Sequence, residues 1–85
     1  MHWELNIDPK IEKQLKRFPP KERARLFAII QEFAFNPYAG DIEKMKGEAD
    51  VWRRRVGSYR IKYEIYTFRK IVRVFSVERR TSQTY

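Results

Sequence analysis

The sequence predicts an α+β fold in which an N-terminal strand and a two-helix hairpin pack on a twisted, mostly antiparallel four-stranded sheet. Residues 10–35 carry apolar side chains at helical spacing, whereas residues 51–77 alternate apolar and polar side chains as strands do. The chain has 85 residues, 42% of them hydrophobic, and no Cys. This composition predicts a single domain over residues 1–85, with one modest core and no disulfides.

The N-terminal residues predict a strand followed by a short helix. Residues 2–7 alternate, which places three apolar side chains on one face. Asp8 and Pro9 indicate a helix start, because Asp accepts hydrogen bonds from free backbone amides and Pro suits the first helical position. The helix is expected to end at Pro19 and Pro20. Its apolar residues at helical spacing are Ile11, Leu15 and Phe18.

A second helix is predicted from about Lys21 to Phe35, with apolar side chains on more than one stripe. Such a helix is expected to pack on the sheet and also on a partner. Asn36 and Pro37 end it, and the sequence NPYAGD that they begin is typical of turns. A connecting segment then leads through residues 45–50 to the strands.

Three consecutive strands are predicted at residues 51–56, 60–66 and 71–77, with short turns at Gly57 and around residues 67–70. Strand alternation sorts the basic side chains by face. Arg54 is expected on the core side near a sheet edge, with its head reaching water. The face opposite the helices is expected to hold Arg53, Arg55 and Arg60.

Positive charge is concentrated in the second half of the chain. Residues 1–43 carry equal numbers of basic and acidic side chains, so the formal net charge of +8 comes from residues 44–85. Most of these basic residues are Arg, which binds phosphate in a planar, bidentate way. The asymmetry favours nucleic-acid binding over the alternative that the charge serves only solubility.

Several classes of protein are excluded by the composition. No apolar run approaches the roughly 18 residues needed to cross a bilayer, and residues 1–8 lack a signal-peptide core, so we expect no membrane association and a cytoplasmic protein. With His2 as the single His and no Cys, we expect neither a metal site nor a cofactor. Glu48, Asp50 and Glu78 lack a partner acid for paired-carboxylate hydrolysis.

The strand region carries a resemblance to a known family. The run WRRRVGSYRIKYEIY at residues 52–66, the strand IVRVFSV at residues 71–77, and the following Arg79 and Arg80 with Tyr85 beyond them resemble the RelE/ParE superfamily of bacterial and archaeal type II toxins. The lead-in KMKGEADVW at residues 44–52 is similar to the same family. The resemblance covers essentially the whole chain and implies the fold of RelE-like microbial RNase toxins.

The resemblance implies a toxin of the RelE-like branch, a ribosome-dependent and metal-independent endoribonuclease that cuts mRNA in the ribosomal A site. Its implied partners are the ribosome, mRNA and a cognate antitoxin that silences it, in a heterotetramer. We expect the neighbouring Arg54, Lys62 and Arg79 to bind RNA. The positions that match the family's catalytic residues are Arg53, Arg55, Arg60, Arg80 and Tyr85.

The arginines explain phosphate binding but leave the proton acceptor open. Arg keeps its proton at any accessible pH, so Arg53 and Arg55 are poor bases, whereas the family often has Lys there. Tyr85 is a candidate base or a residue that stacks on an mRNA base. Two alternatives therefore stay open: a ParE-like DNA gyrase poison without nuclease activity, and a non-catalytic RNA-binding module.

Overall fold

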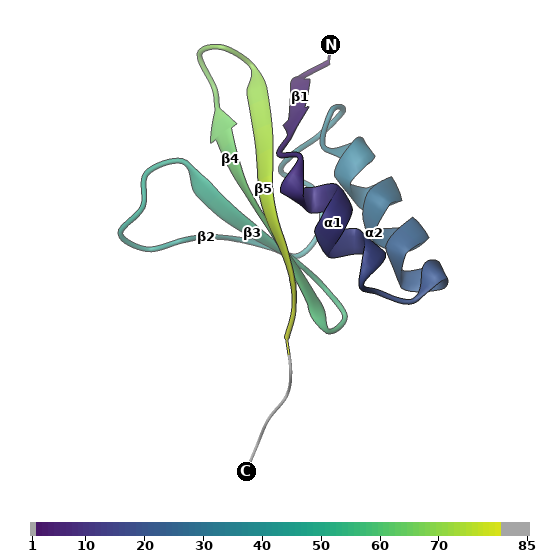
Figure 1. Cartoon of the computed structure of the whole chain (residues 1–85). Coiled ribbons are helices and arrows are strands. Elements are labelled where there is room, and N and C mark those ends of the chain that lie inside the picture. Colours follow the sequence, from purple (N-terminus) through teal and green to yellow (C-terminus); the bar gives the residue numbers. More distant parts are fainter. Residues whose placement is uncertain (1, 81–85) are drawn as a thin grey trace.

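The computed structural model describes residues 2–80 as five strands and two helices. The α1–α2 hairpin covers one face of the sheet, and the described residues place no helix on the other face (Figure 1). None of the described helices is long and apolar enough to cross a membrane. In chain order the elements are β1 (Glu4–Ile7), α1 (Lys10–Lys16), α2 (Pro20–Glu32), β2 (Ile42–Lys44), β3 (Val51–Val56), β4 (Tyr59–Tyr66) and β5 (Ile71–Arg79).

The sheet has five strands in the order β1-β5-β4-β3-β2, one more than the sequence predicted. β1 runs parallel to β5, and the other neighbours are antiparallel, which confirms the α+β class and the mostly antiparallel sheet. The strand that the prediction missed is β2. Its sequence, IEK, is too short for alternation to be visible, and its hydrogen-bonding partners lie about ten residues further along the chain, in β3.

Local hydrogen bonds mark the start of α1 and the end of α2. Asp8 Oδ1 accepts a hydrogen bond from the backbone N–H of Lys10 at 3.0 Å, which satisfies a free amide at the start of α1. α2 ends at Glu32, three residues before the predicted Phe35. Residues 33–35 continue as a tighter turn with i to i−3 hydrogen bonds. Pro37 prevents the helix from resuming, because the residue before a proline is disfavoured in the helical conformation.

The core lies between the helix hairpin and β4, the middle strand of the sheet. Alternate residues of β4 are buried, and Tyr63 stacks on Phe33 of the segment after α2 with ring centroids 4.3 Å apart. Each fully buried aliphatic or aromatic side chain contributes roughly 1.5–3 kcal/mol. The cluster consists of Ile11, Leu15, Leu26, Ile30, Phe33, Val56, Tyr59, Ile61, Tyr63, Ile65, Val72, Val74 and Val77.

The loop after α2 is anchored to this core by a hydrogen bond and by aromatic contacts. The hydroxyl of the buried Tyr63 donates a hydrogen bond to the carbonyl oxygen of Pro37 at 2.8 Å. Burial raises the pKa of Tyr63 far above its ordinary value, so the hydroxyl keeps the proton that it donates. Next in the loop, Tyr38 packs edge-on against the indole rings of Trp3 and Trp52.

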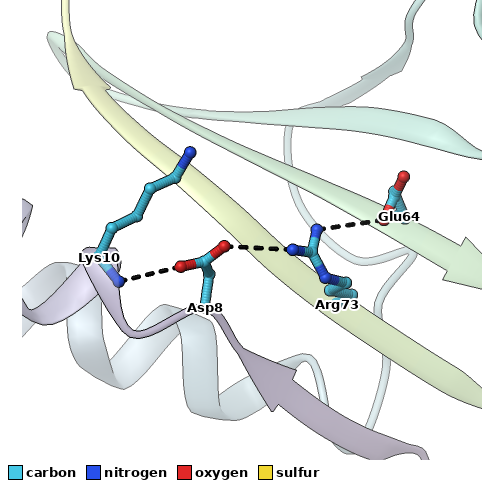
Figure 2. A network of polar contacts seen from close by, with 4 residues as sticks. All are labelled: Asp8, Lys10, Glu64 and Arg73. Carbon is cyan, nitrogen blue, oxygen red and sulfur yellow. Dashed lines mark hydrogen bonds and ion pairs between the residues drawn. The ribbon is translucent and has the colours of Figure 1, made fainter.

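An ion-pair network joins the start of α1 to the middle of the sheet. Figure 2 shows Arg73 of β5 between two carboxylates, with Asp8 at 3.1 Å and Glu64 of β4 at 3.5 Å. Asp8 uses its other oxygen for the amide of Lys10, so one side chain both begins the helix and binds the sheet. The network therefore fixes where the helix hairpin starts relative to β4 and β5.

Tyr63→Phe is expected to lower the free energy of unfolding by about 1–2 kcal/mol, because it leaves the buried Pro37 carbonyl without its donor. Urea unfolding monitored by circular dichroism measures the change. Tyr66→Phe is the matched control, since Tyr66 lies at the exposed end of the same strand and is expected to shift stability by less than about 0.5 kcal/mol. Equal losses in the two variants would contradict the role assigned to the Tyr63 hydrogen bond.

Candidate active site

Four basic side chains meet on the face of the sheet opposite the helices. In the antiparallel pairing of β3 and β4, Arg53 lies opposite Lys62 and Arg55 lies opposite Arg60. Alternation sends these residues to the open face, while their neighbours Val56 and Ile61 point into the core. The same alternation that builds the core therefore brings the cations together.

A pocket of about 230 Å³ lies where β2, β3 and β4 meet the chain after β5. Arg80 reaches it because its backbone N–H bonds to the carbonyl oxygen of Ser58, in the turn between β3 and β4. Gly57 allows that turn with a φ of +59°, a conformation that favours glycine. The lining residues are Asp41, Glu43, Arg53, Arg55, Arg60 and Arg80.

Two carboxylates in this pocket are paired with the arginines. Glu43 forms an ion pair with Arg53, and Asp41 Oδ2 accepts a hydrogen bond from Arg55 Nε at 3.1 Å. The Asp41 and Glu43 side chains are 62% and 67% exposed, so each pair contributes only about 0–1 kcal/mol. Such pairs exchange readily, and an incoming phosphate competes with a carboxylate for the same guanidinium.

Sequence reasoning missed Asp41 and Glu43, because it assigned residues 36–41 to a turn and did not recognise β2. The available signal was their spacing of two residues, which places both side chains on one face of an extended segment. That signal becomes informative only when β2 is known to pair with β3, with Glu43 directly opposite Arg53.

The structure brings together four of the five predicted catalytic residues, since Arg53, Arg55, Arg60 and Arg80 line one pocket. Tyr85 lies outside the described residues. Lys62 is on the same open face but pairs with Glu78 at 3.5 Å beyond the pocket lining. Arg79 is exposed and lies opposite Tyr59, a core residue, so its position in the pleat belongs to the helix side of the sheet.

Arg54 lies on the core side of β3, as its place in the pleat predicted, and away from the pocket. Its Nη1 donates to the carbonyl oxygen of Ala39 at 3.3 Å. The expectation that its head reaches water is wrong for one atom, because Nε is buried and has no hydrogen-bond partner among the described residues. The guanidinium lies against Gly40 instead, where the loop after α2 crosses it.

The pocket has the chemistry of a phosphate-binding site. Four guanidinium groups in one small space are suited to hold the charge of a phosphodiester and of the still more negative transition state of its cleavage. The two carboxylates add proton acceptors, which arginine cannot supply. Within residues 2–80, no three His, Asp or Glu side chains are grouped so that they could hold a metal ion.

The fold and the pocket together define a small basic protein with an arginine-lined pocket on an open sheet face. The family model described as ParE toxin of type II toxin–antitoxin system, parDE, matches residues 5–83. This chain therefore belongs to that family of type II toxins. The predicted membership of the RelE/ParE superfamily is confirmed.

One relative named RelE is similar in sequence, and solved RelE structures are similar in fold. RelE1 of Methanocaldococcus jannaschii is 28% identical over 83 residues, which cover 94% of this chain and 92% of the relative. The RelE–RelB complex of Pyrococcus horikoshii OT3 matches with a TM-score of 0.81 at 22% identity, covering 98% of this chain and all of that one. The isolated E. coli RelE toxin matches with a TM-score of 0.77 at 20% identity, covering 95% and 87%.

Replacing Arg60 by Met is expected to weaken binding of a short single-stranded oligonucleotide and to reduce the slope of log K against log salt by about 0.7, the effect of one lost phosphate contact. Fluorescence anisotropy over a salt series measures both quantities. Arg25→Met on the exposed surface of α2 removes the same charge away from the pocket and is expected to leave the slope unchanged. Equal slopes for the two variants would rule out a phosphate contact at Arg60.

Proposed function

We propose that this toxin is an endoribonuclease that cuts mRNA held in the ribosomal A site and so stops translation. The observation that carries the proposal is a pocket in which four arginines meet two carboxylates. Two observations support this reading over a pure binding function. A relative named RelE1 is similar to this chain, and the pocket supplies the groups that phosphodiester cleavage needs. A reaction on the ribosome takes place in the cytoplasm, with mRNA and the ribosome as partners.

The arginines bind the scissile phosphate and stabilise its transition state. Attack by the RNA 2′-hydroxyl produces a pentacoordinate phosphorus with an additional negative charge, and guanidinium groups already in place lower the energy of that charge. Arg60 and Arg53 project from adjacent strands of a hydrogen-bonded sheet. Arg80 approaches from the end of β5. These side chains therefore surround the phosphate from three segments of the chain.

Glu43 is the proton acceptor in this proposal. Cleavage requires that the 2′-hydroxyl lose its proton, and a carboxylate that contacts Arg53 lies within reach of any phosphate bound to that arginine. Asp41 instead accepts from Arg55 through both its backbone carbonyl and its side chain, so its role is to orient Arg55. We assign Tyr85 to stacking on an mRNA base, and Lys62 to contact with the RNA backbone next to the pocket.

A second candidate function is a gyrase poison that binds without chemistry. It is favoured by the family model, whose description names ParE rather than RelE. The two functions differ in their first effect after induced expression. A ribosome-dependent nuclease stops protein synthesis before DNA is damaged, whereas a gyrase poison damages DNA while translation continues.

A cognate antitoxin is proposed to bind the helix hairpin. An apolar groove of about 520 Å³ runs between α1 and α2, where Phe27 is 44% exposed and Ile7 is 38% exposed. An amphipathic helix fits a groove of this kind, because its apolar stripe buries surface that the free toxin leaves in water. Lys16 and Arg23 line the groove together with Glu12, so the groove itself carries both signs of charge. The toxin's net charge of +8 favours an acidic antitoxin as a whole.

Glu43→Gln is expected to lower the rate of mRNA cleavage on programmed ribosomes by about 10²-fold or more, because the amide cannot accept the proton, while binding to the ribosome stays the same or tightens. Single-turnover cleavage with end-labelled mRNA measures the rate, and co-sedimentation measures binding. Arg53→Ala is the comparison variant and is expected to weaken both.

Glu22→Gln on α2 removes a carboxylate outside the pocket and is the control for charge alone. A Glu43→Gln protein that cuts at the wild-type rate would contradict the assignment of the acceptor. If the wild-type protein leaves ribosome-bound mRNA intact and instead traps gyrase on DNA, the second function replaces the first.

Phe27→Glu is expected to weaken the complex with the cognate antitoxin by about 2 kcal/mol or more, because it places a charge in the apolar groove. Isothermal titration calorimetry with the purified antitoxin measures the affinity. Phe68→Glu is the matched control, since Phe68 is fully exposed at the turn between β4 and β5, away from the groove. Equal losses in affinity would place the antitoxin elsewhere.

A further inference from the structure

Three consecutive arginines of β3 each contact residues 39–43, which run from the loop after α2 into β2. Two of them point to the open face and pair with carboxylates of that segment, whereas the middle one points to the opposite face and bonds to its backbone. Residues 39–43 are therefore bound from both sides of β3. The contacts are Arg53 with Glu43, Arg54 with Ala39, and Arg55 with Asp41.

Arg54 lies directly against the backbone of this segment. A Cβ atom built on Gly40 would lie 2.3 Å from Arg54 Cζ, closer than non-bonded atoms approach. Gly40 also has a φ of +86°, a conformation that other residues rarely adopt. The guanidinium therefore occupies the space that a side chain at residue 40 would need, and the backbone crosses it at close range.

This contact lies one residue from the pocket. Asp41 binds Arg55 twice, because its carbonyl oxygen accepts from the Arg55 backbone N–H at 2.9 Å and its carboxylate accepts from Arg55 Nε at 3.1 Å. The Asp41 side chain is mostly exposed, so it owes its position to the backbone that carries it. Earlier in the loop, the hydrogen bond from Tyr63 fixes Pro37. Arg54 extends that anchoring to residues 39 and 40.

We propose that Arg54 is a positioning residue: its guanidinium holds residues 39–41 so that Asp41 stays against Arg55 in the pocket, and Gly40 makes room for it. Its effect on catalysis rests on the proposed RNA cleavage, in which Asp41 orients Arg55. Arg54 thus acts on the reaction from the far side of the sheet, without touching RNA.

The buried Nε makes this role separable from stability. Arg54 Nε is buried without a hydrogen-bond partner among the described residues, which is costly, and a hydrophobic side chain of similar length can fill the apolar part of such a site with little loss of stability. Arg54→Met is therefore expected to keep the thermal midpoint while releasing the segment. If Arg54 were needed only for folding, Arg54→Met would instead lower the thermal midpoint without releasing the segment.

Arg54→Met in the full chain is tested by two measurements. In NMR spectra, exchange of the Arg55 backbone amide and of its Nε–H with water is expected to become about tenfold faster, since both hydrogen bonds go to Asp41. In single-turnover cleavage on programmed ribosomes, the rate is expected to fall about tenfold with half-saturation within about twofold. Arg25→Met, on the exposed surface of α2, is the control for loss of a charge.

A double-mutant cycle distinguishes action through Asp41 from a general structural effect. In an Asp41→Ala background, Arg54→Met is expected to slow cleavage by less than about twofold further, because the side chain that it positions is already absent. An additional tenfold loss in that background would overturn the proposal, as would unchanged Arg55 exchange in the single variant. Gly40→Ala displaces the guanidinium from the other side and is expected to reproduce the exchange result if Arg54→Met fails to fold.

The two proposals fail separately. If the wild-type protein does not cut RNA on ribosomes, the proposed function fails, and Arg55 exchange in the Arg54→Met and Gly40→Ala proteins still decides whether Arg54 positions Asp41. If the wild-type protein cuts RNA and Arg55 exchange is the same in wild-type and Arg54→Met proteins, the positioning role fails alone.

Discussion

The rest of the structure depends on the pairing register of β4, a strand with one apolar face and one charged face. Its odd-numbered residues, including Ile61, Tyr63 and Ile65, are buried under the helix hairpin, while Arg60, Lys62 and Glu64 face the open side. A shift of one residue in its pairing would bury the charges and expose the core, at a cost far above the few kcal/mol of a small domain's net stability. The apolar face therefore fixes the register that places the arginines.

This arrangement crowds positive charge at the pocket. Arg55 and Arg60 lie directly opposite each other in β3 and β4, and like charges at such a position repel. Asp41 and Glu43 offset part of this repulsion from β2 and the residue before it. In the proposed reaction the same carboxylates take different roles, because Glu43 accepts the proton and Asp41 orients Arg55. The ion pairs that offset charge repulsion in the free pocket are therefore the ones that the proposed chemistry uses.

Much of the fold and part of the site could be predicted from local sequence. Alternation in residues 51–66 is sufficient to assign Arg53, Arg55 and Arg60 to one face, since side chains alternate along each strand and the apolar positions of each strand show which side faces the core. The missing strand, β2, has three residues and no visible periodicity, so nothing local distinguishes it from a turn. Because the strand was missed, the carboxylates that it carries were missed with it. The exposure of the Arg54 guanidinium to water was predicted wrongly for Nε for a related reason. The loop that lies against this guanidinium, at Gly40, is distant in sequence.

The sequence by itself determined the α+β class, the helix hairpin, the two faces of the sheet and the concentration of arginine on one of them. These features follow from residue periods and backbone preferences that act over a few positions. Only the tertiary structure decided that Glu43 lies beside Arg53, that Asp41 is held by Arg55, and that Arg54 supports the loop between them. Each of these contacts joins residues ten or more positions apart, and the core that brings such residues together exists only in the folded chain.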